Sequence, residues 1–570
     1  MSENIGKRWE VSPPITSPAN EALAAFSPVL RQVLYNRGYA TDVDARSFLE
    51  GNVNFDTSPN QMLGVALTVE RLRIALDHKE LIAIYGDYDV DGVSATALLV
   101  EALRAFGGIV KPYIPNRFEE GYGLNKDALS NLQDEGVKLV VSVDCGIRSP
   151  DEANHAHTIG LDLIITDHHQ PADGDLPSAF SVVNPKQVDD LYPDKDLAGV
   201  GVAYKIIQAL VESVGSSPEG FQAEDLLDLV ALGTVADLAP LSGENRVLVR
   251  KGLEKLRETK RQGLFSLAAV ADLSLSKVNA TSIGFVIGPR LNAAGRLESA
   301  LAAFELLTTR DVKAAGELAQ KLNIQNRQRQ EITRKIQAEA EEIILAEDPH
   351  ADIFFVVHPD FNAGVVGLAA SRLVETYYRP AIVGQISGET TRCSCRSIPE
   401  FNITEALDQC KDLLVQHGGH AAAAGFTVRN ENMGALKQQL KSIAAKVLHG
   451  RNLQQTLTAD MVINLSDLDS KLFHQLEFLQ PTGYGNPEAV FVSRGVRITN
   501  KRSVGMDGKH LKLVVTDERI TFDAIGFRLG HLLKELPTRV DILFTFESNE
   551  FNGRQSLQLN LKDVKPGENL

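Results

Sequence analysis

Three aspartates stand at alternate positions where an apolar segment of the chain ends. The stretch LIAIYGDYDVDG (residues 81–92) runs through aliphatic residues to Tyr85 and then presents Asp87, Asp89 and Asp91. One aspartate here would be ordinary, because aspartate is common at strand ends and helix N-caps. Like charges this close repel unless a cation lies between them, and oxygen ligands suit Mg²⁺ and Mn²⁺. The spacing therefore predicts a divalent-metal site at this strand end.

Two further apolar segments end in the same residue type. KLVVSVD ends at Asp144 and LDLIITD ends at Asp167, which His168 and His169 follow directly. One imidazole can bind a metal ion while a nearby carboxylate orients its ring, and the other can face a substrate phosphate. Asp237 lies in the apolar stretch LVALGTVADLAPL, where an unpaired carboxylate would be costly. All these residues are therefore candidates for one metal centre.

The elements that must position these residues alternate along the chain. Between about residues 80 and 240, short apolar runs are each followed by a turn and helical periodicity, which indicates a parallel sheet covered on both faces. Open α/β sheets bind ligands beyond the carboxyl ends of their strands, so the strand-end aspartates should converge. Residues 311–347 contain no proline and one glycine, and predict a long helix between two lobes rather than within a core. A second α/β lobe should follow, and alternation from about residue 455 predicts an antiparallel β-barrel, an OB-fold.

Composition limits the classes of protein to consider. A chain of 570 residues predicts three or four domains. The formal net charge of −16 argues against a nucleic-acid binder, but ions bound at an acidic site would cancel part of it. Four cysteines, a polar start without a signal-peptide core and no apolar run near the ~20 residues of a membrane span predict a cytoplasmic protein with no membrane association.

The order DYDVDG, VDCG, DHH and a late aspartate resembles the DHH phosphoesterase superfamily. The resemblance implies a two-ion site for Mn²⁺ or Mg²⁺, with Asp144 bridging, Asp167 as an orienting residue and His169 as a phosphate contact or acid. The metal ligands that it implies are Asp89, Asp91, Asp144, His168 and Asp237, which leaves Asp87 as a structural neighbour. Two ions ~3.5–4 Å apart activate water and neutralise charge during in-line displacement. Many members carry histidine where this chain has Tyr85, so one ion is expected to be held more loosely.

Further segments narrow the resemblance. IGPRLNAAGRLE (287–298), SCRS (394–397), GGHAAAAGF (418–426) and EFLQPTGYGNP (477–487) together resemble the RecJ family of bacterial single-strand-specific DNA exonucleases. That resemblance implies 5′→3′ degradation of single-stranded DNA to 5′-mononucleotides, in repair and recombination. The partners it implies are single-stranded DNA, single-strand-binding protein and a RecQ-like helicase, and we expect a monomer.

The second lobe should bind phosphate. The resemblance implies that Ser394, Arg396 and Arg117 hold the 5′-terminal phosphate, and a guanidinium fork suits that ligand. His420, in a glycine-rich segment that allows close backbone approach, can donate to a phosphate oxygen. Backbone phosphates are the expected partners of Arg290 and Asn292, although a structural role for Asn292 at a loop–helix junction is equally open.

The same resemblance divides the chain into five parts. These are an N-terminal element at 1–60, the DHH catalytic domain at 61–310, the connecting helix at 311–349, the DHHA1 domain at 350–450 and an OB-fold-like domain at 451–570. Barrel aromatics could stack on bases, but core packing explains Phe491, Phe544 and Phe551 better.

Two other functions remain open. The first is a DHH phosphodiesterase for short oligonucleotides, cyclic dinucleotides or polyphosphate, against which the long helix and the barrel argue. The second is a non-catalytic replication scaffold, against which the retained set of metal ligands argues.

Overall fold

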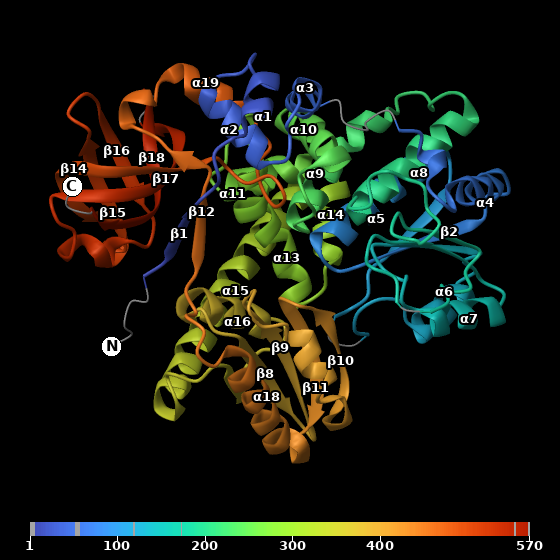
Figure 1. Ribbon diagram of the computed structural model, residues 1–570. Coiled ribbons are helices and arrows are strands. Elements are labelled where there is room, and N and C mark those ends of the chain that lie inside the picture. Colours follow the sequence, from blue (N-terminus) through green and yellow to red (C-terminus); the bar gives the residue numbers. More distant parts are fainter. Residues whose placement is uncertain (1–5, 52–56, 118–119, 173, 552–553, 568–570) are drawn as a thin grey trace. The chain divides into compact units, whose positions relative to one another are not determined.

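The computed structural model forms two compact units (Figure 1). The smaller unit holds residues 289–455 with Gly6 and 116–117, and the larger unit holds 7–115, 120–288 and 456–567. The residues that the structure describes are 6–51, 57–117, 120–172, 174–551 and 554–567. Throughout those residues, we find no helix whose length and hydropathy suit a bilayer span.

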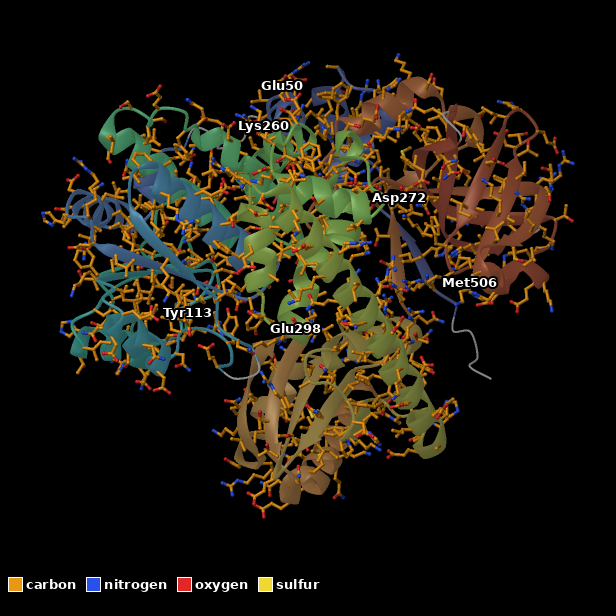
Figure 2. The ribbon with its side chains drawn as sticks, turned by 180° about the vertical axis from the view of Figure 1, so that it is seen from behind. Glu50, Tyr113, Lys260, Asp272, Glu298 and Met506 are labelled. Atoms are coloured by element: carbon orange, nitrogen blue, oxygen red, sulfur yellow. The ribbon has the colours of Figure 1, made fainter. Side chains whose placement is uncertain are left out.

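A five-stranded parallel sheet forms the centre of the larger unit, with strand order β3-β2-β4-β5-β6. Its strands are β2 Leu81–Gly86, β3 Ile109–Tyr113, β4 Leu139–Val143, β5 Asp162–Thr166 and β6 Ser181–Val183. Tyr113 marks the sheet in Figure 2. One face packs against α6 (Lys126–Asp134) and α7 (Pro150–Thr158). The helices α5 (Val90–Ala105), α8 (Gly199–Val214) and α9 (Leu227–Ala236) pack on one another and on the sheet. The predicted parallel sheet is confirmed.

The larger unit also contains the predicted barrel. Its strands are β13 Met461–Val462, β14 Val490–Val504, β15 His510–Thr516, β16 Thr521–Gly526, β17 Arg539–Phe551 and β18 Arg554–Pro566. Pairing of β14 with both β15 and β17 closes the sheet, and Met506 marks its β14–β15 connection in Figure 2. Phe491 and Phe544 are fully buried in the barrel core, as predicted, while the side chain of Phe551 lies outside the described residues. We call residues 478–489, between α19 (Ser470–Glu477) and β14, the barrel-entry loop.

The N-terminal helices complete this barrel core. α2 (Pro28–Asn36) contributes Leu30 and Val33, and α3 (Asp42–Glu50) contributes Phe48, to the same apolar cluster as the barrel strands. Strand β1 (Arg8–Val11) pairs in parallel with β12 (Thr456–Ala459), and the indole Nε1 of Trp9 donates to Asp563 Oδ2 at 2.7 Å. The start of the chain is therefore built into its C-terminal domain.

The smaller unit contains α13 (Gly288–Leu297), α14 (Leu301–Thr308) and the predicted long helix, α15 (Val312–Glu347), which is 36 residues long. The Asp311 carboxylate caps it by accepting from the Ala314 amide at 2.6 Å. The expectation that this helix stands outside any core is wrong, since Ala315, Ala319 and Leu322 are fully buried in its N-terminal half and its C-terminal half is buried too. Ile336, Ala340 and Ile344 are buried against β7 and α16, because one face of the helix repeats apolar residues every four positions.

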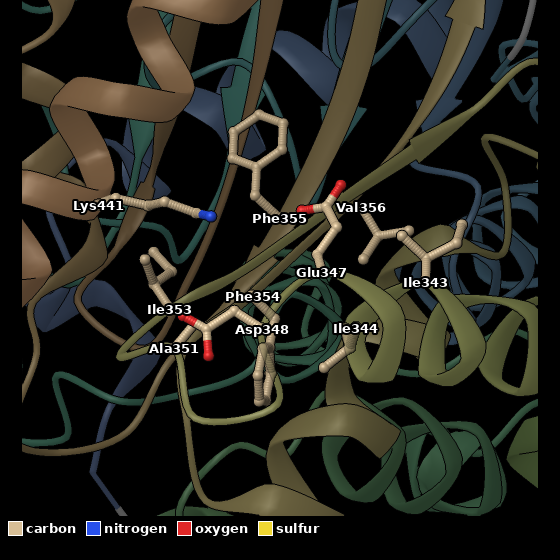
Figure 3. Close-up of a pocket in the computed structure, with 10 residues that line it drawn as sticks. All are labelled: Ile343, Ile344, Glu347, Asp348, Ala351, Ile353, Phe354, Phe355, Val356 and Lys441. Carbon is tan, nitrogen blue, oxygen red and sulfur yellow. The ribbon is translucent and has the colours of Figure 1, made fainter.

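A mixed sheet follows α15, with strand order β10-β11-β9-β8-β7. Its strands are β7 Phe354–His358, β8 Ala381–Ser387, β9 Thr390–Arg396, β10 Leu414–His420 and β11 Ala423–Arg429, with helices α16 Val366–Tyr377 and α18 Met433–Leu448. Only β7 and β8 pair in parallel among the described strands of this sheet. A small cavity lies where α15 ends beside β7 and α18 (Figure 3). Its lining is mainly apolar, with Glu347, Asp348 and Lys441 as the charged members.

Candidate metal centre

Acidic and histidine side chains follow three adjacent strands of the parallel sheet. Asp87 comes directly after β2, Asp144 after β4, and Asp167, His168 and His169 after β5. Since the strands are parallel, their carboxyl ends lie at one edge of the sheet. Asp237 joins them from the C-terminal end of α9. The predicted convergence is therefore present.

Two helix N-termini hold the first aspartate pair. Asp89 is the N-cap of α5, and its Oδ1 accepts from the amides of Asp91 (2.9 Å) and Gly92 (3.1 Å). Asp91 is fully buried, and its carboxylate accepts from Gly199 (2.7 Å) and Val200 (2.9 Å) at the start of α8. A helix N-terminus favours negative charge, so α8 stabilises an ionised Asp91.

His168 lies among three carboxylates. Its Nε2 is 3.0 Å from Asp144 Oδ1, 3.6 Å from Asp237 Oδ2 and 3.9 Å from Asp91 Oδ2. Asp144 has a φ of 62°, in the left-handed region, which aspartate tolerates better than most residues but at some cost in strain.

Asp167 orients the second histidine rather than the first. Its Oδ1 accepts from the amides of His168 (2.7 Å) and His169 (3.0 Å) and contacts His169 Nδ1 at 2.8 Å. Burial lowers the pKa of His169, but the hydrogen bond and charge of Asp167 outweigh it, so that pKa is raised overall. Burial likewise opposes ionisation of Asp167, yet its bonds to His169 and to the Ile147 amide hold its pKa below the usual range.

The electrostatics of the cluster fit a cation. Burial and then the charge of Asp89 raise the pKa of Asp91 to about 7, and burial followed by Asp91 and Asp89 raises the pKa of Asp237 to about 9. Burial and the same neighbours raise the pKa of Asp144. Burial, followed by the charge of His169, lowers the pKa of His168 to about 3, so its imidazole is neutral, as a metal ligand must be. Cations would relieve the repulsion among the carboxylates.

The donor atoms form overlapping sets whose members lie within 4.8 Å of one another. The sets are Asp87, Asp89 and Asp144; Asp91, His168 and Asp237; and Asp144, His168 and His169. Every predicted ligand belongs to at least one of them, and both Asp144 and His168 belong to two. Asp87, which the sequence set apart as structural, is buried within the same reach. Tyr85 is in the core, where its hydroxyl donates to Gly123 O at 3.1 Å.

The smaller unit brings together the side chains predicted to bind a terminal phosphate. Ser394 and Arg396 alternate on β9, and a Cβ on Gly367, in the first turn of α16, would lie 3.2 Å from Arg396 Nη2 and 3.4 Å from Ser394 Oγ. Burial lowers the pKa of Arg396, and the charge of nearby Arg117 lowers it further. Two cations and a helix N-terminus thus lie together, an arrangement that favours an anion.

The remaining predicted residues are more dispersed within that unit. His420 is exposed at the end of β10, and its strand partner Ala423 also pairs with Arg396. Arg290 and Asn292 lie on α13 (Gly288–Leu297), and Arg290 Nε donates to Asn323 Oδ1 on α15 at 3.1 Å.

Two glycines that leave room for the carboxylates were not predicted from the sequence. A Cβ on Gly199 would lie 2.8 Å from Asp144 Cβ, and one on Gly233 would lie 2.6 Å from Asp91 Oδ1. Tyr122 was also missed, although its ring packs edge-on to His169 with centroids 6.3 Å apart. The stretches DLAGVGV and EEGYG hold two of these residues, but only the folded chain shows what they touch.

Comparisons with known proteins agree with this architecture. The model of the DHH family, N-terminal domain, matches residues 81–234, the part that forms the sheet and most of the acidic cluster. The DHHA1 domain matches residues 351–446 and the RecJ OB domain matches residues 459–563. The fold and the site therefore define a DHH-class protein with two further modules.

Individual relatives narrow the class. The single-stranded-DNA-specific exonuclease RecJ of Bacillus subtilis is 36% identical over 98% of this chain and 71% of its own length. RecJ of Escherichia coli is 34% identical over 95% of this chain and 96% of its own. The crystal structure of Thermus thermophilus RecJ in complex with Mn²⁺ has a TM-score of 0.84 at 29% identity, covering 99% of this chain and 80% of that one. This chain belongs to the RecJ family.

Metal-free protein should lose stability as the pH rises from about 4 to about 9. Unfolded aspartate has a pKa of about 3.9, whereas the folded pKa is about 7 for Asp91 and about 9 for Asp237. The folded state then holds more protons than the unfolded state across this window, so the free energy of unfolding falls with rising pH. Urea denaturation in the presence of a chelator measures the free energy of unfolding at each pH. Added Mn²⁺ should restore the lost stability, and Asp237→Asn should make the free energy of unfolding depend less on pH. A stability that rises with pH in chelator would contradict the prediction.

Gly199→Ala should disable the site, because its Cβ would displace Asp144. We expect a loss of metal affinity of roughly 10–100-fold or more, as for other changes that move a ligand. Gly201→Ala, on the same helix, is the matched control, since its Cβ meets only Leu197 and Leu248 at 3.5 Å and beyond. Mn²⁺ titration of both variants checks this, and equal affinities would show that the close approach at Gly199 is irrelevant.

Proposed function

We propose that this protein is a metal-dependent exonuclease that degrades single-stranded DNA 5′→3′ to 5′-mononucleotides, in DNA repair and recombination. The observation that carries the proposal is the buried cluster at the ends of three adjacent strands, in a chain of the RecJ family. The ligands are Asp89, Asp91, Asp144, His168 and Asp237. The ions are Mn²⁺ or Mg²⁺, which the similar Thermus thermophilus RecJ structures contain.

The bound ions supply Lewis-acid activation of water and neutralise charge that develops on the phosphoryl group. The chain's own residues prepare that chemistry. The amides at the start of α8 favour the ionised form of Asp91 against the effect of its burial, and burial keeps His168 neutral. Asp167 binds Nδ1 of His169, so the other ring nitrogen is available to donate to a phosphate oxygen. The raised pKa of His169 favours the protonated ring in that role.

Polarity follows from anchoring one end of the strand. Ser394, Arg396 and Arg117 bind the 5′-terminal phosphate, with charge-assisted hydrogen bonds that arginine can make in pairs. Arg290, Asn292 and His420 contact phosphates further along the strand. A chain held by its 5′ phosphate is then cut from that end, one nucleotide at a time.

The remaining assignments extend this proposal to the whole chain. The barrel binds the strand further from its 5′ end, as OB-folds do. Single-strand-binding protein and a RecQ-like helicase are the proposed partners. The protein acts as a monomer in the cytoplasm. We keep the five domains with the limits given in the sequence analysis.

A long single strand labelled at its 5′ or its 3′ end tests the proposal. With Mn²⁺, labelled mononucleotide should appear at once from the 5′-labelled strand only, and a blunt duplex should resist. Asp144→Ala should slow release by more than roughly 100-fold, since even outer-shell changes cost that much.

Three other outcomes would each overturn part of it. Release first from the 3′-labelled strand would overturn the terminal-phosphate assignment. Activity confined to dinucleotides and 3-mers would assign the chain to the small-substrate branch. No turnover together with no Mn²⁺ binding that depends on Asp144 would indicate a scaffold.

Arg396→Gln should weaken use of 5′-phosphorylated DNA selectively. Loss of a charge-assisted hydrogen bond costs ~1.5–3 kcal/mol, or about 10–150-fold in kcat/KM. DNA with a 5′-hydroxyl should be affected far less, because it lacks the group that Arg396 binds. Arg392→Gln is the control, since Arg392 is exposed on the same strand. Equal losses on the two substrates would remove Arg396 from the phosphate site.

A further inference from the structure

Asp237 lies in a sharp and strained turn at the end of α9. The amide of Leu238 donates to Val235 O at 3.3 Å and the amide of Ala239 donates to Thr234 O at 3.2 Å, the two hydrogen bonds of a Schellman motif. Glycine usually occupies the left-handed position of this motif. Here Leu238 does so with a φ of 61°, and its side chain is 67% exposed. Such strain persists only where surrounding structure holds the turn.

The barrel-entry loop supplies that support. The amide of Leu241 donates to Tyr484 O at 2.7 Å. A Cβ on Gly483 would lie 2.8 Å from Leu241 Cδ1, and one on Gly485, whose φ is 74°, would lie 2.9 Å from Pro240 Cβ. The loop backbone therefore packs directly on the residues that follow Asp237, at a distance that only glycine allows.

The loop is itself held in shape. Asn486 is buried, and its side-chain amide donates to two carbonyls of the loop at 2.8 Å each. Arg246, on α10 (Gly243–Arg257), is 1% exposed and donates to Phe478 O at 2.9 Å and Gln480 O at 2.6 Å. The segment that begins at Asp237 thus contacts the loop twice, through its first turn and through α10.

We propose that the barrel-entry loop is a positioning element for the metal ligand Asp237, acting through Pro240 and Leu241. The inference rests on the proposed function, in which Asp237 binds metal. Asp237 Oδ2 lies 3.6 Å from His168 Nε2, and divalent ions tolerate little error in the placement of their ligands. A shift of the turn moves this carboxylate while leaving the ligands on the sheet in place. The attachment of the barrel thereby sets metal affinity.

Gly485→Ala tests the inference, with Gly495→Ala as the matched control. Both glycines have positive φ, 74° and 62°, so each alanine carries a similar backbone strain. The Cβ at position 495 meets nothing within 4 Å, whereas the Cβ at 485 meets Pro240. Mn²⁺ binding is measured by the electron paramagnetic resonance of free Mn²⁺, with thermal unfolding and exonuclease rates beside it.

Gly485→Ala should bind Mn²⁺ about tenfold more weakly and need about tenfold more Mn²⁺ for half-maximal activity. At saturating Mn²⁺ its kcat should return to the wild-type value, which a general loss of structure would not allow. Gly495→Ala should match wild type in Mn²⁺ binding, although its alanine carries the same kind of backbone strain and lowers the melting temperature too.

Equal Mn²⁺ affinity of the two variants would overturn the inference. If Gly485→Ala does not fold, Gly483→Ala takes its place, because its Cβ meets only the flexible end of Leu241, and it should weaken binding in the same direction. Wild-type protein that binds no Mn²⁺ would instead overturn the proposed function, and the inference with it.

Discussion

Repulsion among carboxylates that are packed out of water is the constraint around which the larger unit is arranged. Asp91 and Asp144 are buried and lie near Asp89 and Asp237, and a low-dielectric interior strengthens their mutual repulsion. Backbone amides offset part of this repulsion: those at the N-terminus of α8 donate to Asp91, and that of His168 donates to Asp167. His168, whose imidazole is neutral, adds a nitrogen donor to the cluster without adding charge. These contacts offset only part of the repulsion among the carboxylates. The remaining repulsion favours the binding of divalent ions.

The smaller unit is arranged around the opposite charge. Arg117 lies close enough to Arg396 for its charge to lower the pKa of Arg396, and Gly367 lets the first turn of α16 approach Arg396 and Ser394. Each unit therefore concentrates one sign of charge at one end of its own sheet.

The sequence predicts the parts of the site that depend on local order. Asp87, Asp144 and Asp167 each end an apolar run, and parallel strands bring such ends together whatever the details of packing. Gly199 and Gly233 could not be found this way, because their role appears only when α8 and α9 approach residues more than 50 positions away. The orienting contact of Asp167 with His169 rather than His168 depends on side-chain rotamers that spacing does not encode. The apolar residues of α15 could be seen in the sequence, but the length of the helix led us to expect a connector between lobes rather than a part of a core.

The hydrogen bond between Trp9 and Asp563 joins residues that are 554 positions apart, and β1 pairs with β12 across 448 positions, as from Arg8 to Thr456. The helices that contribute Leu30 and Phe48 likewise find their apolar partners only in the barrel. During synthesis, these segments must therefore wait for barrel strands that lie several hundred residues later in the chain. Their apolar faces remain uncovered throughout that interval, which exposes the nascent chain to aggregation. The parallel-sheet domain has its own core and can form earlier, so assembly would proceed from the middle of the chain outward, with the two ends folding last.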